Sequence, residues 1–210
     1  MLSKSFIASL LIATSVLGSP VNLEVRQSCS ALQLVHIAGT TESGLGIVGT
    51  PLAAAVASAV PGTTTKSITY DTSAEYIVTV AAGAAITAGY IASQAAACPN
   101  QRFVLSGYSK GALVLHSTST ILSSNLKPKV ACVLVFGDPG RNIDLNPWPI
   151  NSPSVDLAPK DGSTSSENIA SFCNTGDLFC AMPGYSLPAH LAYPIDGSIG
   201  VAANFVKDRA

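Results

Sequence analysis

A sharp glycine-bounded turn between an apolar strand and a helix is the feature that most restricts how this chain can fold. A strand is predicted at Phe103–Ser106, the turn is Gly107–Gly111 (GYSKG), and a helix is expected from about Ala112 to Ser124. Side chains two positions before or after Ser109 would collide with so tight a turn, and the strained backbone exposes the serine hydroxyl. Ser109 is therefore the candidate nucleophile, and an ordinary glycine-rich turn with a solvated serine is the alternative.

Apolar strands alternate with helices along the rest of the chain. Further strands are predicted at Leu32–Ala38, Val130–Phe136 and Ile169–Phe172, and further helices at about Pro51–Ala59, Ser73–Ala97 and Gly200–Lys207. Thr72 and Glu75 form a candidate capping box for the second of these helices. The stretch Arg141–Glu167 is rich in Pro, Asn, Ser and Asp and is expected to be a long surface loop. This alternation implies an α/β domain whose parallel sheet is covered on both faces.

The N-terminus has the layout of a secretory signal peptide, which we assign to residues 1–18. A lysine precedes the apolar run Phe6–Leu17, and small residues follow it. A membrane anchor is the alternative, but the run is shorter than the roughly 20 apolar residues of a spanning helix, and no later stretch is better. Residues 19–27 are interpreted as a linker or pro-segment, and residues 28–210 as one domain.

Charge excludes some classes of partner. The formal net charge is −1 and no basic stripe exists, so nucleic acid is not an expected partner. Only 11% of the residues are charged, whereas 48% are hydrophobic. This low share of charged residues is compatible with a protein that acts on apolar or insoluble material.

Five cysteines in a secreted chain suggest disulfides with one thiol left over. Cys173 and Cys180 are close enough to pin a tight loop, and Cys29 and Cys98 flank the first half of the domain. Cys132 lies inside an apolar strand and is expected to be a buried free thiol. A zinc site is the alternative, but the chain has no C-x-x-C pair and its three histidines do not cluster with the cysteines. Spacing alone leaves the pairing open, and no metal is expected.

A serine nucleophile needs a base that takes its proton. His190 is the candidate base, because it alone lies far enough downstream of Ser109 to return to the site. His116 follows Ser109 by seven residues on the same predicted helix, which separates them by about 10 Å. His36 lies within the first strand and is expected to be structural.

The base must in turn be oriented by an acid, and two aspartates compete for that role. Asp177 lies between Cys173 and Cys180, so a disulfide there would hold its carboxylate rigidly. Its alternative role is that of a turn aspartate. Asp138 follows a strand end, but Gly-Asp-Pro is a common turn signal. Asp177 is therefore favoured.

Several segments resemble the cutinase family of fungal esterases. They are Gly107–Ala112, Cys173–Cys180 and His190–Tyr193, with Gly39–Gly44 similar to that family's oxyanion loop and Cys98–Pro99 and Phe136–Pro139 adding family-like spacing. The similarity covers essentially the whole mature chain. It implies a compact, lidless α/β-hydrolase with a five-stranded parallel sheet and helices on both faces.

The resemblance also implies roles for individual residues. It assigns Ser109 as the nucleophile, Asp177 as the orienting acid and His190 as the base. Thr40 matches the family's oxyanion serine or threonine, and the backbone N–H of Lys110 supplies the second donor. No cofactor is needed for this chemistry.

The family's two disulfides map onto four cysteines of this chain. They pair Cys29 with Cys98 and Cys173 with Cys180, which leaves Cys132 free.

Two departures from the family pattern bear on the substrate. The family usually has Gln where Lys110 stands, and an exposed ammonium there would alter substrate preference. The run Gly137–Pro139 is more like the acetylxylan esterase branch, whereas the Asp177 and His190 segments are more like true cutinases. We therefore expect a secreted serine esterase that acts on cutin and short acyl esters. An acetylxylan esterase is the second hypothesis, and a non-catalytic secreted effector is the third.

The expected partner is an ester substrate, either cutin or another insoluble polyester, or acetylated xylan. Met182 and Leu187 precede His190 and are predicted to form one wall of the acyl cleft, with a plain surface loop as the alternative. No membrane span is expected in the mature chain, and we expect a monomer.

The assignment of His190 as base predicts how the rate depends on pH. Because the imidazole must be neutral to accept the proton of Ser109, activity should rise with pH between about 5 and 8, where histidine loses its charge. Initial rates on a soluble ester across that range test this expectation. A flat profile would count against His190.

Overall fold

The computed structural model describes residues 29–141, 155–162 and 167–210. The signal peptide assigned to residues 1–18 and the linker or pro-segment at 19–27 lie outside the described residues, as does most of the predicted loop Arg141–Glu167.

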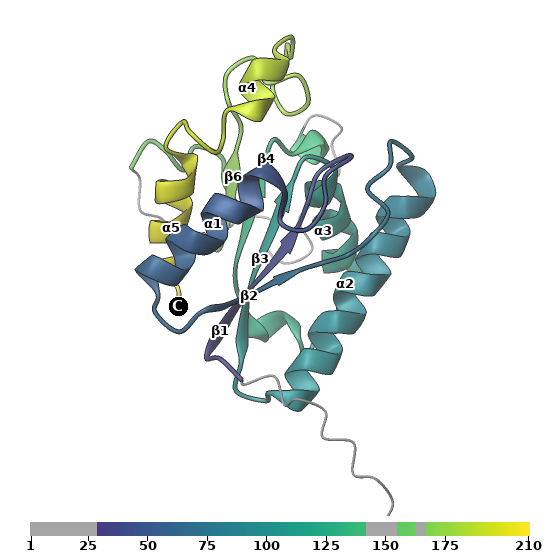
Figure 1. Cartoon of the computed structure of the whole chain (residues 1–210), viewed down its shortest axis with the longest axis vertical. Helices are drawn as coiled ribbons and strands as arrows, with labels where there is room; N and C mark the ends of the chain where they lie inside the picture. The colour runs from purple at the N-terminus through teal and green to yellow at the C-terminus, as the bar shows by residue number, and fades with distance from the viewer. Residues whose placement is uncertain (1–28, 142–154, 163–166) are drawn as a thin grey trace, which may run out of the picture.

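A parallel sheet forms the centre of the molecule (Figure 1). Its strands are β1 (Leu32–Ile37), β2 (Thr64–Ser67), β3 (Arg102–Tyr108), β4 (Val130–Phe136), β5 (Val155–Asp156) and β6 (Ile169–Phe172). They lie in the order β2-β1-β3-β4-β6-β5, and every neighbouring pair is parallel. The expected count of five is therefore one too low. The edge strands β2 and β5 are short, and the polar sequence TTKS of β2 carries no apolar pattern that predicts a strand.

Helices cover both faces of the sheet. They are α1 (Gly46–Ala59), α2 (Ile77–Ala97), α3 (Lys110–Ile121), α4 (Leu187–Leu191) and α5 (Ser198–Lys207), with short 3-10 turns at Lys127–Lys129 and Pro139–Arg141. Figure 1 shows α1 beside α5 on one face and α2 beside α3 on the other. Among the residues that the structure describes, α2 alone is long and apolar enough to cross a membrane by length and composition, a test that helices covering the sheet of an α/β domain also pass.

The start of α2 differs from the predicted capping box. The helix begins at Ile77 rather than Ser73. The Glu75 carboxylate itself accepts hydrogen bonds from the backbone of the first turn, at 2.8 Å from Ile77 N and 2.9 Å from Thr79 N. The Thr72 hydroxyl instead donates to the carbonyl of Glu42, at 2.8 Å. The predicted box is wrong because Thr72 has a tertiary partner that its own segment does not reveal.

The strands separate two apolar clusters. Side chains such as Leu34, Val104 and Leu134 pack toward α1 and α5. Their neighbours along the same strands, such as Val35 and Leu105, pack toward α2 and α3. Successive side chains of a strand point to opposite faces, so each strand of the sheet centre must be apolar on both.

The cysteines are paired as the resemblance implies. Cys29 is bonded to Cys98 and Cys173 to Cys180. Cys132 is a buried free thiol within the cluster beside α1 and α5, and its burial raises its pKa to about 12. It is therefore an unreactive core residue at neutral pH.

Candidate active site

Ser109 occupies the turn between β3 and α3 with a φ of 53°, a conformation that non-glycine residues rarely adopt. Its backbone N–H donates to the carbonyl of Phe136 at the end of β4, at 2.9 Å. A Cβ atom on Gly107 would lie 2.5 Å from the carbonyl oxygen of Gly111, and one on Gly111 would lie 2.1 Å from that of Ile37. Both glycines are thus required by close backbone approach.

Asp177 and His190 form a buried hydrogen-bonded pair. The His190 Nδ1 atom lies 2.9 Å from Oδ2 and 3.0 Å from Oδ1 of Asp177. The hydroxyl of Tyr193 donates to Oδ2 at 2.5 Å, and Phe179 N donates to Oδ1 at 2.8 Å. Burial by itself raises the pKa of Asp177, but these hydrogen bonds outweigh it, so the pKa lies below its usual value. The carboxylate is therefore held in its charged form.

The imidazole of His190 is enclosed by aromatic rings. The Tyr108 ring stacks on it with centroids 5.0 Å apart, and the Phe179 ring lies at 4.5 Å. The Tyr108 hydroxyl also donates to the carbonyl of His190, at 3.0 Å. His190 is only 3% exposed. These contacts leave the ring little freedom to change its orientation.

The same contacts place His190 against residues close in the fold to the turn of Ser109. Tyr108 precedes Ser109 in the chain, and a Cβ atom on Gly137 would lie 2.5 Å from the Cε1 atom of His190. Gly137 follows Phe136, whose carbonyl binds the Ser109 amide. The imidazole thus packs against Tyr108 of β3, which directly precedes the serine, and against Gly137, which directly follows β4.

A short disulfide loop and a one-turn helix support the pair. The Cys173–Cys180 bond closes the loop that carries Asp177. His190 lies on α4, whose N-terminus is capped by Ser186 Oγ. Asn174 connects the two elements, because its side-chain amide donates to the carbonyl of Ala189 at 2.9 Å.

Thr40 and Lys110, the candidate oxyanion donors, lie at the ends of β1 and β3. Thr40 follows β1, and its hydroxyl lies 2.7 Å from the Tyr76 hydroxyl. Lys110 is the first residue of α3, where backbone N–H groups lack partners within the helix. Its side chain is completely buried, so the expected exposed ammonium is wrong.

The competing sequence candidates have other partners. Asp138 lies 2.8 Å from Nε2 of His116 and accepts from Gly140 N at 2.8 Å, so it binds α3 and its own turn. His36 is buried, with Nδ1 3.1 Å from Ser106 Oγ, and burial lowers its pKa to about 3. Within the described ranges, no three His, Cys, Asp or Glu side chains are grouped as a metal site.

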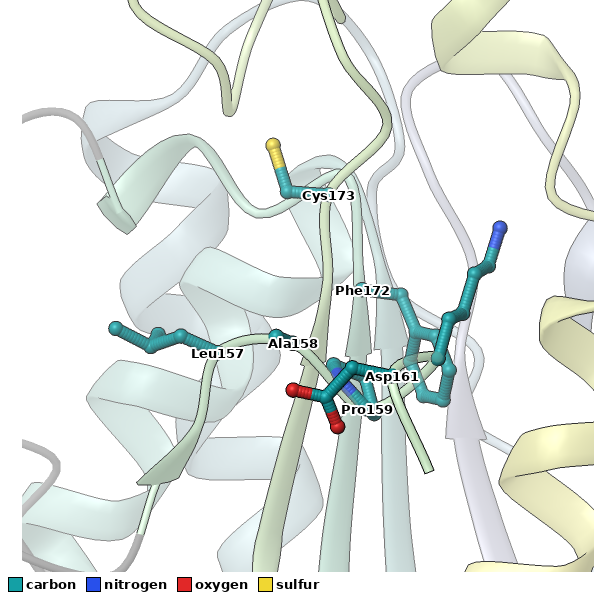
Figure 2. Close-up of a pocket in the computed structure, with 7 residues that line it drawn as sticks. Leu157, Ala158, Pro159, Asp161, Phe172 and Cys173 are labelled. Carbon is teal, nitrogen blue, oxygen red and sulfur yellow. The ribbon is translucent and has the colours of Figure 1, made fainter. Parts of the chain in front are cut away.

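The residues predicted to line the cleft are exposed. Met182 is 80% exposed and Leu187 48%. A pocket of about 310 Å³ lies elsewhere, lined by Leu157, Ala158, Pro159, Lys160, Asp161, Phe172 and Cys173 (Figure 2). Neither Met182 nor Leu187 belongs to its lining.

Sequence reasoning missed the aromatic residues around the pair. Tyr193, Tyr108 and Phe179 all contact Asp177 or His190, yet none was singled out. The available signal was their position, since each lies within three residues of Ser109, Asp177 or His190.

Comparison with known proteins agrees with this architecture. The family model described as Cutinase matches residues 28–210. A cutinase of Botryotinia fuckeliana is 29% identical over 99% of this chain and 97% of its own. The carboxylesterase Culp1 of Mycobacterium tuberculosis is 30% identical over 86% and 82%, and cutinase CUT1 of Coprinopsis cinerea is 35% identical over 88% of both chains.

Two solved structures have the same fold. An acetylxylan esterase is 26% identical, with a TM-score of 0.70 over 87% of this chain and 99% of that one. A Trichoderma reesei cutinase in complex with a phosphonate inhibitor is 24% identical, with a TM-score of 0.69 over 85% and 75%, and shares the fold.

The lowered pKa of Asp177 predicts how acid affects stability. A carboxylate with a lower pKa in the folded state stabilises it above the unfolded pKa of about 3.9, and this contribution is lost as pH falls. The difference in unfolding temperature between wild type and Asp177→Asn should therefore shrink from about pH 5 to about pH 3. Asp208→Asn, at an exposed residue, is the control and should show no such trend. A constant difference for Asp177→Asn would contradict the prediction.

Proposed function

The chain belongs to the cutinase family of carboxylic ester hydrolases, and we propose that it is a secreted serine esterase that uses Ser109, His190 and Asp177. The observation that carries this proposal is the buried Asp177–His190 pair, packed against Tyr108, which directly precedes a strained serine, and against Gly137. A carboxylate only accepts hydrogen bonds, so Nδ1 of His190 carries the proton. Its Nε2 lone pair is then available to the Ser109 hydroxyl.

The proposed reaction has two halves. His190 takes the proton of Ser109 as its oxygen attacks the ester carbonyl, and the resulting oxyanion is bound by Thr40 and the Lys110 N–H. The alcohol leaves with the proton from His190, and an acyl-enzyme remains on Ser109. Water, deprotonated by His190, then releases the acid and restores the serine.

Exposed apolar side chains support an apolar substrate. Met182 and Tyr185 lie before α4 and Leu187 is its first residue, and these side chains are 80%, 74% and 48% exposed. Ile77 is 88% exposed and follows Tyr76, whose hydroxyl contacts that of Thr40. Apolar surface on the segments that adjoin His190 and Thr40 favours cutin or another insoluble polyester over a sugar acetate.

An acetylxylan esterase is the second candidate. The solved acetylxylan esterase structure supports it, because this chain is 26% identical to that protein and covers 99% of its length. Both candidates use the same catalytic groups, so only the substrate separates them.

Secretion is part of the proposal. The apolar N-terminal run has the layout of a signal peptide. Two disulfides within the described residues are typical of an oxidising, extracellular setting.

Covalent labelling tests the nucleophile. An organophosphonate should label wild type and Ser123→Ala, a change at an exposed serine, but not Ser109→Ala. Ser109→Ala should lose roughly 10⁴-fold or more in turnover. Mass spectrometry of the labelled peptide and initial rates on cutin and on acetylated xylan provide the measurements. Wild type that stays unlabelled would indicate a non-catalytic binding protein, and faster release from xylan would favour the second candidate.

Introducing a charge at Leu187 tests whether this residue forms a wall of the cleft that binds the acyl chain of the substrate. Leu187→Asp should lower kcat/KM for long-chain esters by about 10-fold, because contact with one or two CH₂ groups contributes about 0.8 kcal/mol each. Short acyl esters should be affected less, and an acidic residue at the start of α4 is compatible with the helix. Leu157→Asp changes another exposed leucine, at the separate pocket, and is the matched control. Unchanged hydrolysis of long-chain esters by Leu187→Asp would exclude this wall.

A further inference from the structure

The Lys110 side chain is buried without a carboxylate partner, which is rare for a lysine. Its Nζ atom donates instead to three backbone carbonyls, those of Asp71 at 3.0 Å, Ser73 at 2.5 Å and Glu75 at 2.8 Å. An ammonium group has three N–H donors, so each has an acceptor. The cation is thus enclosed by a single stretch of chain.

Aromatic rings complete the enclosure. Nζ lies 5.5 Å from the centroid of the Tyr70 ring and 5.2 Å from that of Tyr76. Ring faces attract cations at these distances. Burial lowers the pKa of Lys110, and the charges of Asp71 and Glu75 oppose that change.

The enclosing stretch, residues 71–76, belongs to no helix or strand and ends at Tyr76, directly before α2. It also holds the loop that carries Thr40. Thr41 N donates to the carbonyl of Thr72 at 2.7 Å, and the Thr72 hydroxyl donates to the carbonyl of Glu42 at 2.8 Å. The Tyr76 hydroxyl lies 2.7 Å from that of Thr40. With Tyr76 as the donor in this contact, the Thr40 hydrogen is available to an oxyanion.

We propose that Lys110 is a positioning residue for the oxyanion hole: its ammonium group holds residues 71–76, which in turn fix the hydroxyl of Thr40. This inference rests on the proposed role of Thr40 as an oxyanion donor. Lys110 then contributes to the oxyanion hole in two ways. Its backbone N–H is one donor, and its side chain orients the other.

A double-mutant cycle tests this coupling. Lys110→Met keeps the backbone N–H and an unbranched side chain that is shorter by one atom, but removes the three donors, and Thr40→Val removes the hydroxyl with little change of shape. Thr40→Val should lower kcat by roughly 10²–10³-fold. Lys110→Met should lower kcat by about 10-fold or more with KM changed less than about threefold, because the lost interaction acts on the transition state. In the Thr40→Val background, Lys110→Met should change kcat by less than about threefold, since no hydroxyl remains to be positioned.

Controls separate positioning from folding. Lys66→Met removes another ammonium that lies over a tyrosine ring, 5.2 Å from the centroid of Tyr90, and should leave kcat within about twofold. Thermal unfolding of each variant shows whether it folds. If Lys110→Met does not fold, Lys110→Gln, which retains two N–H donors, takes its place, and Tyr76→Phe tests the Thr40 contact in the same cycle.

The outcomes are distinguishable. If Lys110→Met lowers kcat by the same factor with and without the Thr40 hydroxyl, Lys110 does not act through Thr40 and the inference is overturned. If Thr40→Val leaves kcat unchanged, the proposed oxyanion role fails as well. If Ser109→Ala is no longer labelled but Lys110→Met and Thr40→Val act independently, the proposed esterase function is supported and the coupling between Lys110 and Thr40 is excluded.

Discussion

The site depends on a buried carboxylate that has enough hydrogen-bond donors to stay charged. Asp177 is completely buried, and isolating such a charge from water costs several kcal/mol unless partners replace the lost solvent. His190, Tyr193 and the Phe179 amide are those partners. The disulfide loop and α4 therefore have a common effect: together they bring hydrogen-bond donors from separate segments to one carboxylate.

The parallel sheet explains how distant segments meet. The carboxyl ends of parallel strands lie at the same edge, where α/β proteins build their sites. Ser109 follows β3, Gly137 follows β4 and contacts His190, and Cys173 follows β6 and begins the loop of Asp177. These strands lie side by side in the order β3-β4-β6, so the residues that follow them lie close together at one edge of the sheet. Figure 1 shows α4, which carries His190, at the same end of the molecule.

The two sides of the site are stabilised by different means. On one side, a disulfide and close aromatic packing hold Asp177 and His190. On the side of Thr40, the proposed oxyanion donor, the irregular stretch 71–76 is held by hydrogen bonds that converge on one buried ammonium. A serine esterase of this kind needs both sides fixed, because oxyanion donors contribute only when they are already oriented toward the developing charge.

The sequence by itself determined the features that local chemistry dictates. The turn at Gly107–Gly111, the strands Val130–Phe136 and Ile169–Phe172, and the buried thiol of Cys132 follow from apolar runs and glycine spacing. Chain order and the cysteine frame were enough to select His190 and Asp177 as candidates. Each of these inferences depends on residues that are close in sequence or on a fixed order along the chain.

Only the tertiary structure decided features whose partners come from distant segments. The edge strands β2 and β5 exist because a neighbour pairs with them, although their own sequences are short or polar. Asp138 binds His116, Thr72 binds Glu42, and the Lys110 ammonium turns inward to carbonyls more than thirty residues away. A polar side chain is expected at the surface from sequence alone, and burial becomes favourable only where the fold brings enough acceptors to it.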